Sequence, residues 1–256
     1  MALMTRLSVN VNKVALIRNS RMGELPSVVG LAKLALDAGA HGITVHPRPD
    51  QRHIRPYDVD QISEMIKQPA YGDREFNMEG NPLIGHYLEL AARVKPDQCT
   101  LVPDHPDQKT SDHGWDLSGD MTQLMEIVKQ LHDLGCRVSL FMNPDIDAID
   151  QAAQTGADRI ELYTEQYAAT FKCQPEQLDR VYQLYAAAAG KAQALNLGVN
   201  AGHDLNLDNL GRFLSISGIL EVSIGHAIIT DALKMGMRQA VKSYLNVVMN
   251  QSSATP

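Results

Sequence analysis

Cysteines are scarce in this sequence and show no pairing pattern. Cys99, Cys136 and Cys173 form no C-x-x-C motif, and an odd number leaves one thiol unpaired in any disulfide framework. Disulfides are rare in the reducing cytoplasm, and scattered single cysteines are typical of proteins that reside there. We therefore predict a cytoplasmic protein whose cysteines are free thiols.

Long apolar runs and basic blocks are also missing. The chain has no stretch near the ~18 apolar residues of a membrane span, and its start, MALMTRLSVNVNK, lacks the apolar core of a signal peptide. The net charge is −7 and the pI is about 5.7. A negative surface repels phosphate backbones and anionic lipids. These absences argue against a nucleic-acid partner and against a membrane partner.

Several cofactor motifs are absent as well. The sequence contains no G-x-G-x-x-G after a strand-like run, which argues against a dinucleotide site. Nine histidines are present, but there is no H-x-H, H-E-x-x-H or cysteine cluster with metal-ligand spacing. We expect no metal, although a site assembled from His46, Glu79 and His203 on separate strands stays open as an alternative.

What the sequence does contain is a regular alternation of strand-like and helix-like segments. Eight β-branched or apolar runs cover 7–11, 43–45, 75–78, 99–102, 138–142, 160–163, 197–201 and 220–224. They recur about every 30 residues, which suits a right-handed βαβ crossover. We predict one α/β domain over residues 1–256, a (β/α)8 TIM barrel with extra helical segments, ahead of an open doubly wound sheet. The polar residues 250–256 are expected to form a flexible tail.

Proline, asparagine and glycine mark the expected helix boundaries. Helix starts are expected at Pro26, at Asn81 with Pro82, and at Asn143 with Pro144. Helix ends are expected at Gly39, Gly135 and Gly156, where a left-handed residue is wanted. Two segments break the regular spacing. The polar loop 103–119 is a candidate lid, and 166–195 holds more than one helix and is a candidate subunit interface.

Polar residues with useful chemistry collect where the strands end. In a TIM barrel these ends meet on one face, which carries the active site. The residues there are Asn10 and Asn12, His46, Glu79, Pro103, Asn143, Tyr163 with Thr164, His203, and Gly225 with His226. A single histidine at a strand end is usually structural, and Glu79 alone could cap a helix. The joint occurrence of His46, Glu79, His203 and His226 favours a shared catalytic pocket.

Two places are suited to bind phosphate. Arg48 and Arg52 alternate with prolines in the loop after the second strand, together with His53, and we expect them on the rim of the pocket. They form either a bidentate phosphate clamp or a solvated face. Gly225 opens a helix after the last strand, where free backbone N–H groups hold anions. A substrate or substrate pair with two anionic groups fits both places. Lys13 is a weak candidate for a Schiff base.

These motifs closely resemble one known family. VNVNKVALIRNSR (9–21), GITVHPRPDQRHI (42–54), FNMEG (76–80), LVP (101–103), VSLF (138–141), VNAGH (199–203) and IGHAII (224–229) are similar to pyridoxine 5′-phosphate synthases of vitamin B6 biosynthesis. The resemblance extends from about residue 7 to about residue 245. It implies a TIM barrel that condenses 1-deoxy-D-xylulose 5-phosphate with 3-amino-2-oxopropyl phosphate to pyridoxine 5′-phosphate, phosphate and water, without metal or organic cofactor. It also implies a homo-octamer.

The resemblance further implies roles for individual residues. His46 and Glu79 correspond to proton acceptors and His203 to the proton donor. Contacts to the deoxyxylulose phosphate correspond to Arg48, His53 and Thr110. Contacts to the amino-ketone phosphate correspond to Asn10, Arg21, Gly225 and His226. The chain departs from the family pattern at Asn12 and Lys13, where members carry Asp-His, and at Asp204, where members carry glycine. We include these three residues as substrate contacts.

Two other functions compete with this one. A barrel isomerase or epimerase acting on one phosphosugar would use similar groups and would turn over a single substrate. A non-catalytic phosphometabolite-binding protein would bind the same ligands without forming product. Three intact proton-transfer positions favour the enzyme over the binding protein.

Overall fold

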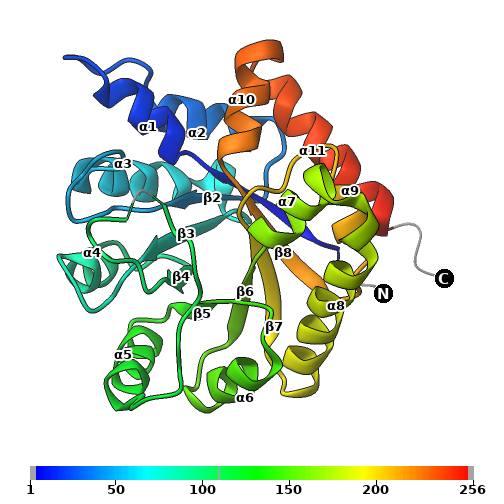
Figure 1. Cartoon of the computed structure of the whole chain (residues 1–256). Helices are drawn as coiled ribbons and strands as arrows, with labels where there is room; N and C mark the ends of the chain where they lie inside the picture. The colour runs from blue at the N-terminus through cyan, green and yellow to red at the C-terminus, as the bar shows by residue number, and fades with distance from the viewer. Residues whose placement is uncertain (1–3, 109, 253–256) are drawn as a thin grey trace.

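A computed structural model describes residues 4–108 and 110–252 of the chain. Eight parallel strands follow one another around a closed barrel, each hydrogen-bonded to the next and β8 to β1 (Figure 1). The strands are β1 (Arg6–Asn10), β2 (Gly42–Val45), β3 (Glu75–Gly80), β4 (Gln98–Leu101), β5 (Arg137–Met142), β6 (Arg159–Tyr163), β7 (Gly198–Gly202) and β8 (Ile219–Ile224). All eight predicted strands and the TIM barrel are confirmed.

Helices surround the barrel on its outside (Figure 1). They are α1 (Asn12–Asn19), α2 (Val28–Asp37), α3 (Pro56–Ile66), α4 (Tyr87–Val94), α5 (Thr122–Asp133), α6 (Ile146–Gln154), α7 (Glu165–Cys173), α8 (Leu178–Ala194), α9 (Leu210–Phe213), α10 (His226–Met235) and α11 (Met237–Ser252), with 3-10 turns η1 (Pro69–Tyr71) and η2 (Pro175–Gln177). The described helices include none that is long and apolar enough to cross a bilayer.

Alternation along the strands divides the barrel into an apolar outer layer and a polar interior. Successive side chains of a strand point to opposite faces. Leu7 and Val9 of β1 belong to the buried apolar core that the helices cover, whereas Ser8 between them bonds Thr44 of β2 at 2.7 Å. Asn77 of β3 continues this interior contact by donating to Thr44 at 3.2 Å. The barrel interior is therefore built to hold polar groups, which is the basis for the site at its end.

The predicted helix ends are confirmed and the three predicted helix starts are wrong. Pro26 precedes Ser27, the N-cap of α2, and so lies outside the first turn. Gly39, Gly135 and Gly156 follow α2, α5 and α6 with φ values of +110°, +85° and +84°. Asn81 does not begin a helix, because its side chain donates to the backbone oxygen of Asp104 and accepts from Leu83 N–H, and α4 begins only at Tyr87. Asn143 and Pro144 precede α6, and the carboxylate of Asp145 caps the helix instead.

The two irregular segments are partly as expected. The stretch 166–195 holds most of α7, η2 and α8, so the expectation of more than one helix is confirmed. Helix α11 runs to Ser252, so the first residues of the predicted 250–256 tail are helical. Residues 253–256 lie outside the described residues.

Candidate active site

A cavity of about 500 Å³ opens at the carboxyl ends of the strands. Its size suits a small-molecule site, since such sites span roughly 300–1,000 Å³. Its walls combine groups from strand ends and from the loops that follow them. The lining residues are Asn10, Asn12, Lys13, Leu16, His46, Arg48, Arg52, His53, Glu79, Val102, Thr110, Ser111, Phe141, Glu161, His203, Asp204, Ser223, Gly225 and His226.

All but one of the residues predicted for catalysis or substrate binding line this cavity. The exception is Arg21, which lies exposed in the turn between α1 and α2 and does not line the cavity. Its role in substrate binding stays a prediction. Four other strand-end residues, Pro103, Asn143, Tyr163 and Thr164, do not line the cavity, and Thr164 instead donates to the backbone oxygen of Gly202 at 2.8 Å.

His46 and Glu79 face each other across the cavity floor. His46 directly follows β2, and its Nδ1 lies 3.9 Å from Glu79 Oε2. Glu79 lies within β3, which extends past the predicted end at residue 78, so the alternative of a helix cap is excluded. Burial, with the nearby charge of Arg48, lowers the pKa of His46 well below its ordinary value. The imidazole is therefore neutral and has a free lone pair at neutral pH.

Burial also favours the uncharged form of Glu79, which for a carboxyl is the protonated form. Burial raises the pKa of its carboxyl to about 8, and the charge of Asp104 adds to the effect. The nearest donors are neutral: Asn10 Nδ2 at 3.3 Å and Ser223 Oγ at 3.5 Å. A carboxyl with a pKa near neutrality can exchange protons in both directions during a reaction.

Arg48 is buried rather than on the rim, so that expectation is wrong. Its guanidinium donates to Asp104 and, through Nη1, to the backbone oxygen of Gln108 at 3.0 Å. Arg48 is only 5% exposed and Asp104 only 2%. His53 is buried too, and burial together with the charges of Arg48 and Lys13 lowers its pKa to about 3. The sequence could not reveal this, because Asp104 lies 56 positions away from Arg48.

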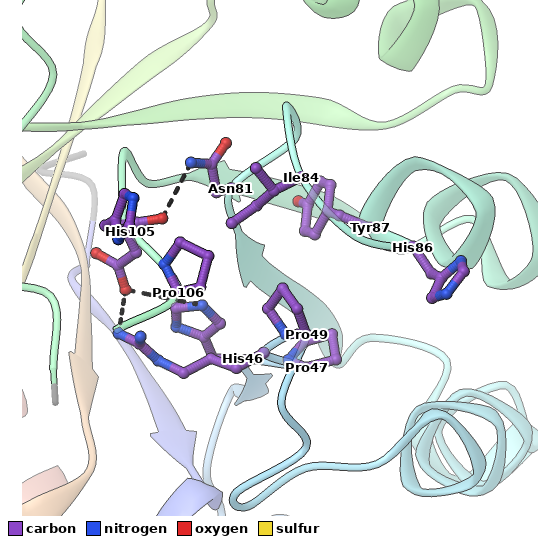
Figure 2. A pocket seen from close by; sticks show the side chains of 11 residues that line it. His46, Pro47, Pro49, Asn81, Ile84, His86, Tyr87, His105 and Pro106 are labelled. Carbon is purple, nitrogen blue, oxygen red and sulfur yellow. Dashed lines mark hydrogen bonds and ion pairs between the residues drawn. The ribbon is translucent and has the colours of Figure 1, made fainter. Parts of the chain in front are cut away.

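Asp104 lies near His46 on the side of the imidazole opposite Glu79. Its Oδ2 lies 3.9 Å from His46 Nε2 and accepts a hydrogen bond from Ser111 Oγ at 2.8 Å. Figure 2 shows a small hollow on this side, with His46 at its edge, Pro106 beside it and Asn81 across from it. The hollow has room for about one water molecule, at about 10 Å³. Within the described residues, Asp104 Oδ1 is buried without a hydrogen-bond partner.

The loop after β4, the candidate lid, contributes Thr110 and Ser111 to the cavity wall. Arg52 donates to the backbone oxygens of Gln108 at 2.6 Å and Pro106 at 2.9 Å. Further along, Thr110 Oγ1 lies 3.1 Å from His203 Nε2. The far end of the loop is fixed by Trp115, whose indole N–H donates to Leu101 O at 2.9 Å. The loop thus connects the β2 side of the cavity to the β7 side.

The opposite wall is suited to an anion. Gly225 precedes α10, and the helix start lacks a side-chain cap, so its first N–H groups are available to a ligand. A Cβ atom on Gly225 would lie 3.2 Å from Asn10 Cγ, so glycine keeps this approach open. Asn10 in turn accepts from Asn12 N–H, and Asn12 Oδ1 accepts from His46 N–H at 2.8 Å. Asn12 therefore orients the end of β2 as well as lining the cavity.

Glu161 is a site residue that the sequence reasoning missed. It lies in the middle of β6, is 3% exposed, and its Oε2 has no hydrogen-bond partner among the described residues. Burial raises the pKa of Glu161 well above its ordinary value, and the charge of Glu79 adds to this. A signal was present, because Glu161 alternates with Ile160 and Leu162 and must therefore face the barrel interior.

Within the described residues, no group of three or more His, Cys, Asp or Glu side chains is arranged to hold a metal ion. The alternative site of His46, Glu79 and His203 therefore has no support from the geometry.

Comparisons with known proteins agree with this architecture. The family model described as "Pyridoxal phosphate biosynthesis protein PdxJ" matches residues 7–250. Proteins named pyridoxine 5′-phosphate synthase are similar: that of Albidiferax ferrireducens is 50% identical over 95% of this chain and 97% of its own. The one from Porphyromonas gingivalis is 48% identical over 94% and 98%.

Solved structures with low sequence identity share the fold. Phosphoribosyl anthranilate isomerase from Thermotoga maritima superposes with a TM-score of 0.60 at 12% identity, covering 96% of this chain and 100% of its own. KGPDC from Streptococcus mutans gives a TM-score of 0.62 at 12% identity, covering 96% and 98%. At such identity the likeness concerns the barrel alone.

Proposed function

Because the chain belongs to the family of the pyridoxal phosphate biosynthesis protein PdxJ, we propose that it is a pyridoxine 5′-phosphate synthase. The reaction joins 1-deoxy-D-xylulose 5-phosphate to 3-amino-2-oxopropyl phosphate and releases phosphate and water, without metal or organic cofactor. The amine of one substrate and the ketone of the other form an imine, and proton transfers then lead to ring closure.

The observation that carries this proposal is the convergence of His46, Glu79 and His203 on one cavity. Every step of the reaction moves a proton, so groups in different protonation states are needed. His46 is a neutral imidazole and Glu79 has a pKa of about 8, so one is a ready acceptor and the other changes state near neutral pH. His46 and Glu79 act as proton acceptors and His203 as the donor.

Two anion-binding walls support a pair of phosphorylated substrates. Arg48, His53 and Thr110 contact the deoxyxylulose phosphate under the lid, and Asn10, Gly225 and His226 contact the amino-ketone phosphate at the start of α10. Asn12 and Lys13 extend the second wall. The lid keeps water away from the imine, which water would hydrolyse.

The direct test is formation of pyridoxine 5′-phosphate from both phosphates, measured with and without a chelator. We expect product only when both substrates are present, and no effect of the chelator. Turnover of a single phosphosugar would indicate an isomerase or epimerase. Binding of both substrates without product would indicate a non-catalytic protein, and either result would refute the proposal.

We further propose a cytoplasmic homo-oligomer, an octamer by resemblance to the family. Exposed apolar side chains gather on α1, the turn after it and the neighbouring α10: Leu16, Ile17, Met22, Leu25 and Leu233. Such a patch is typical of a contact between subunits. Light scattering of the purified protein gives the mass directly, and a monomer at micromolar concentration would refute this part.

A further inference from the structure

Two consecutive residues after β7 adopt a backbone conformation that usually requires glycine. His203 has φ +86° and Asp204 has φ +59°. Side chains with a Cβ atom rarely adopt this region, and strained residues of this kind collect at functional sites when their surroundings hold them in place. Here Thr164 donates to His203 O, and Asn209 Nδ2 donates to Asp204 O at 3.1 Å. The strain is therefore maintained by contacts from neighbouring loops.

This conformation brings the Asp204 carboxylate to the ring of His203. Asp204 Oδ2 lies 3.0 Å from His203 Nδ1, and the other ring nitrogen, Nε2, lies 3.1 Å from Thr110 Oγ1 of the lid. The ring of Tyr163 packs edge-on against the imidazole with centroids 4.9 Å apart. The imidazole is thus fixed at both nitrogens and on one side.

The contact with Asp204 has a consequence for the proton of His203. The hydrogen bond with His203 lowers the pKa of Asp204, so its carboxyl is ionised at neutral pH and can only accept. Nδ1 must then carry the hydrogen, which leaves Nε2 as the nitrogen that gives up or takes a proton on the side of the lid.

We propose that Asp204 is a positioning residue that fixes the Nδ1–H tautomer and the orientation of His203, rather than a substrate contact. The inference rests on the proposed role of His203 in proton transfer. A carboxylate that orients a histidine for proton exchange through its other nitrogen is a recurring catalytic arrangement.

Other charged groups surround this pair and must stay constant in a test. They are Lys13, Asp112, Glu161, Glu165 and His226, together with the phenol of Tyr163. Changes at Asp204 alone leave all of them in place. Asp208, exposed on the same loop, provides a matched control with the same charge.

The test combines tautomer and kinetics in the full-length protein. Histidine labelled with ¹⁵N reports the tautomer, and the His203 signal is assigned by its loss in His203→Gln. In wild type and in Asp208→Asn we expect Nδ1–H. In Asp204→Asn, whose amide can donate or accept, and in Asp204→Gly, which suits φ +59°, we expect a mixture of tautomers. We also expect kcat about tenfold lower with KM for both phosphates within about twofold.

The outcomes separate this inference from the proposed function. An unchanged Nδ1–H signal in both Asp204 variants, an unchanged kcat, or a rise in KM alone would overturn the positioning role. If His203→Gln itself kept full activity, the proposed role of His203 would be wrong, whereas the tautomer measurement would still report on Asp204. The melting temperature of Asp204→Gly checks that the loop remains folded, since glycine relieves the strain there.

Discussion

Each end of the barrel interior holds a glutamate of β3, and the two glutamates differ in whether a basic side chain pairs with them. At the amino ends of the strands, Glu75 accepts from Arg6 at 2.7 Å and from Arg137 at 2.9 Å. At the carboxyl ends, Glu79 lies four residues further along β3, on the same face of the strand as Glu75. Within the described residues, Glu79 pairs with no Lys or Arg. One carboxylate is compensated and the other is not.

The pKa values of the two carboxyls express this difference. Burial would raise the pKa of Glu75, but the hydrogen bond and charge of Arg137 outweigh it and hold the pKa below its ordinary value. Burial of Glu79 is not offset, and its pKa rises to about 8. A compensated pair stabilises the fold, whereas an uncompensated acid is unfavourable for the fold and useful for chemistry. The comparison therefore distinguishes a structural carboxyl, Glu75 at the amino end, from a reactive one, Glu79 at the carboxyl end.

The largest effect is expected from Glu79→Gln. Glutamine has the shape of the protonated acid but cannot accept a proton, so kcat should fall by about 10²- to 10⁴-fold. Product formation from both phosphates under saturating conditions measures it. Activity within about threefold of wild type would remove Glu79 from the reaction.

The pH dependence of the free energy of unfolding provides a second test of the same variant. The folded-state pKa of Glu79 lies above the ordinary 4.5, so the native protein holds an extra proton between about pH 4.5 and pH 8. In wild type this group contributes a loss of stability as pH rises through the window, and Glu79→Gln lacks that contribution. Above pH 8 the variant should be more stable by on the order of a few kcal/mol, measured by denaturant unfolding.

The pH dependence of the wild type comes next in size. If deprotonated Glu79 is the acceptor, kcat/KM should rise about tenfold between pH 7 and pH 9 and level off above the pKa of about 8. A buffer series with both substrates measures this. A profile that is flat from pH 6 to pH 9 would show that another group limits the reaction.

Asp104→Asn should have a smaller effect that falls mainly on binding. The change removes the charge that holds Arg48 and borders His46, while the shape and the bond from Asn81 to the backbone are retained. We expect KM for the deoxyxylulose phosphate to rise about tenfold and kcat to fall less. Asp107→Asn, in the same loop and exposed, is the control. A loss confined to kcat would contradict the binding role.

Glu75→Gln should have the smallest effect on activity, because it mainly lowers the free energy of unfolding. The change leaves Arg6 and Arg137 without their carboxylate at the amino end. We expect a loss of about 2 kcal/mol and a melting temperature lower by about 5 °C. The kcat should stay within about twofold of wild type. A large loss of kcat in a folded variant would show that the two ends are not separate.

The barrel could be predicted from the sequence because strand and helix signals repeat along the chain. Each strand carries its own apolar run, and helix ends such as Gly39 carry a local backbone requirement. Helix starts were less predictable, since Asn81 could cap a helix or bond a distant backbone oxygen, and the fold favours the second. Local patterns therefore fix the elements better than they fix competing hydrogen bonds.

The membership of the site was predictable for the same reason, since the ends of parallel strands must meet. Its electrostatics were not. The sequence around Arg48 is typical of a surface phosphate clamp, and only the structure shows that Asp104 pairs with it. The sequence around Glu161 is that of an ordinary strand, and only the structure shows that Glu161 Oε2 has no hydrogen-bond partner among the described residues. Contacts between residues far apart in the chain decide burial and charge, and no local pattern contains them.

The most direct test of the contrast between the two ends is a ¹³C titration of the glutamate carboxyls in the free protein. Signals are assigned by their loss in Glu79→Gln and Glu75→Gln. The account predicts a midpoint of about 8 for Glu79 and a midpoint below the ordinary 4.5 for Glu75. A midpoint near 4.5 for Glu79 would contradict it, because the environment of Glu79 would then stabilise the ionised carboxylate as well as water does.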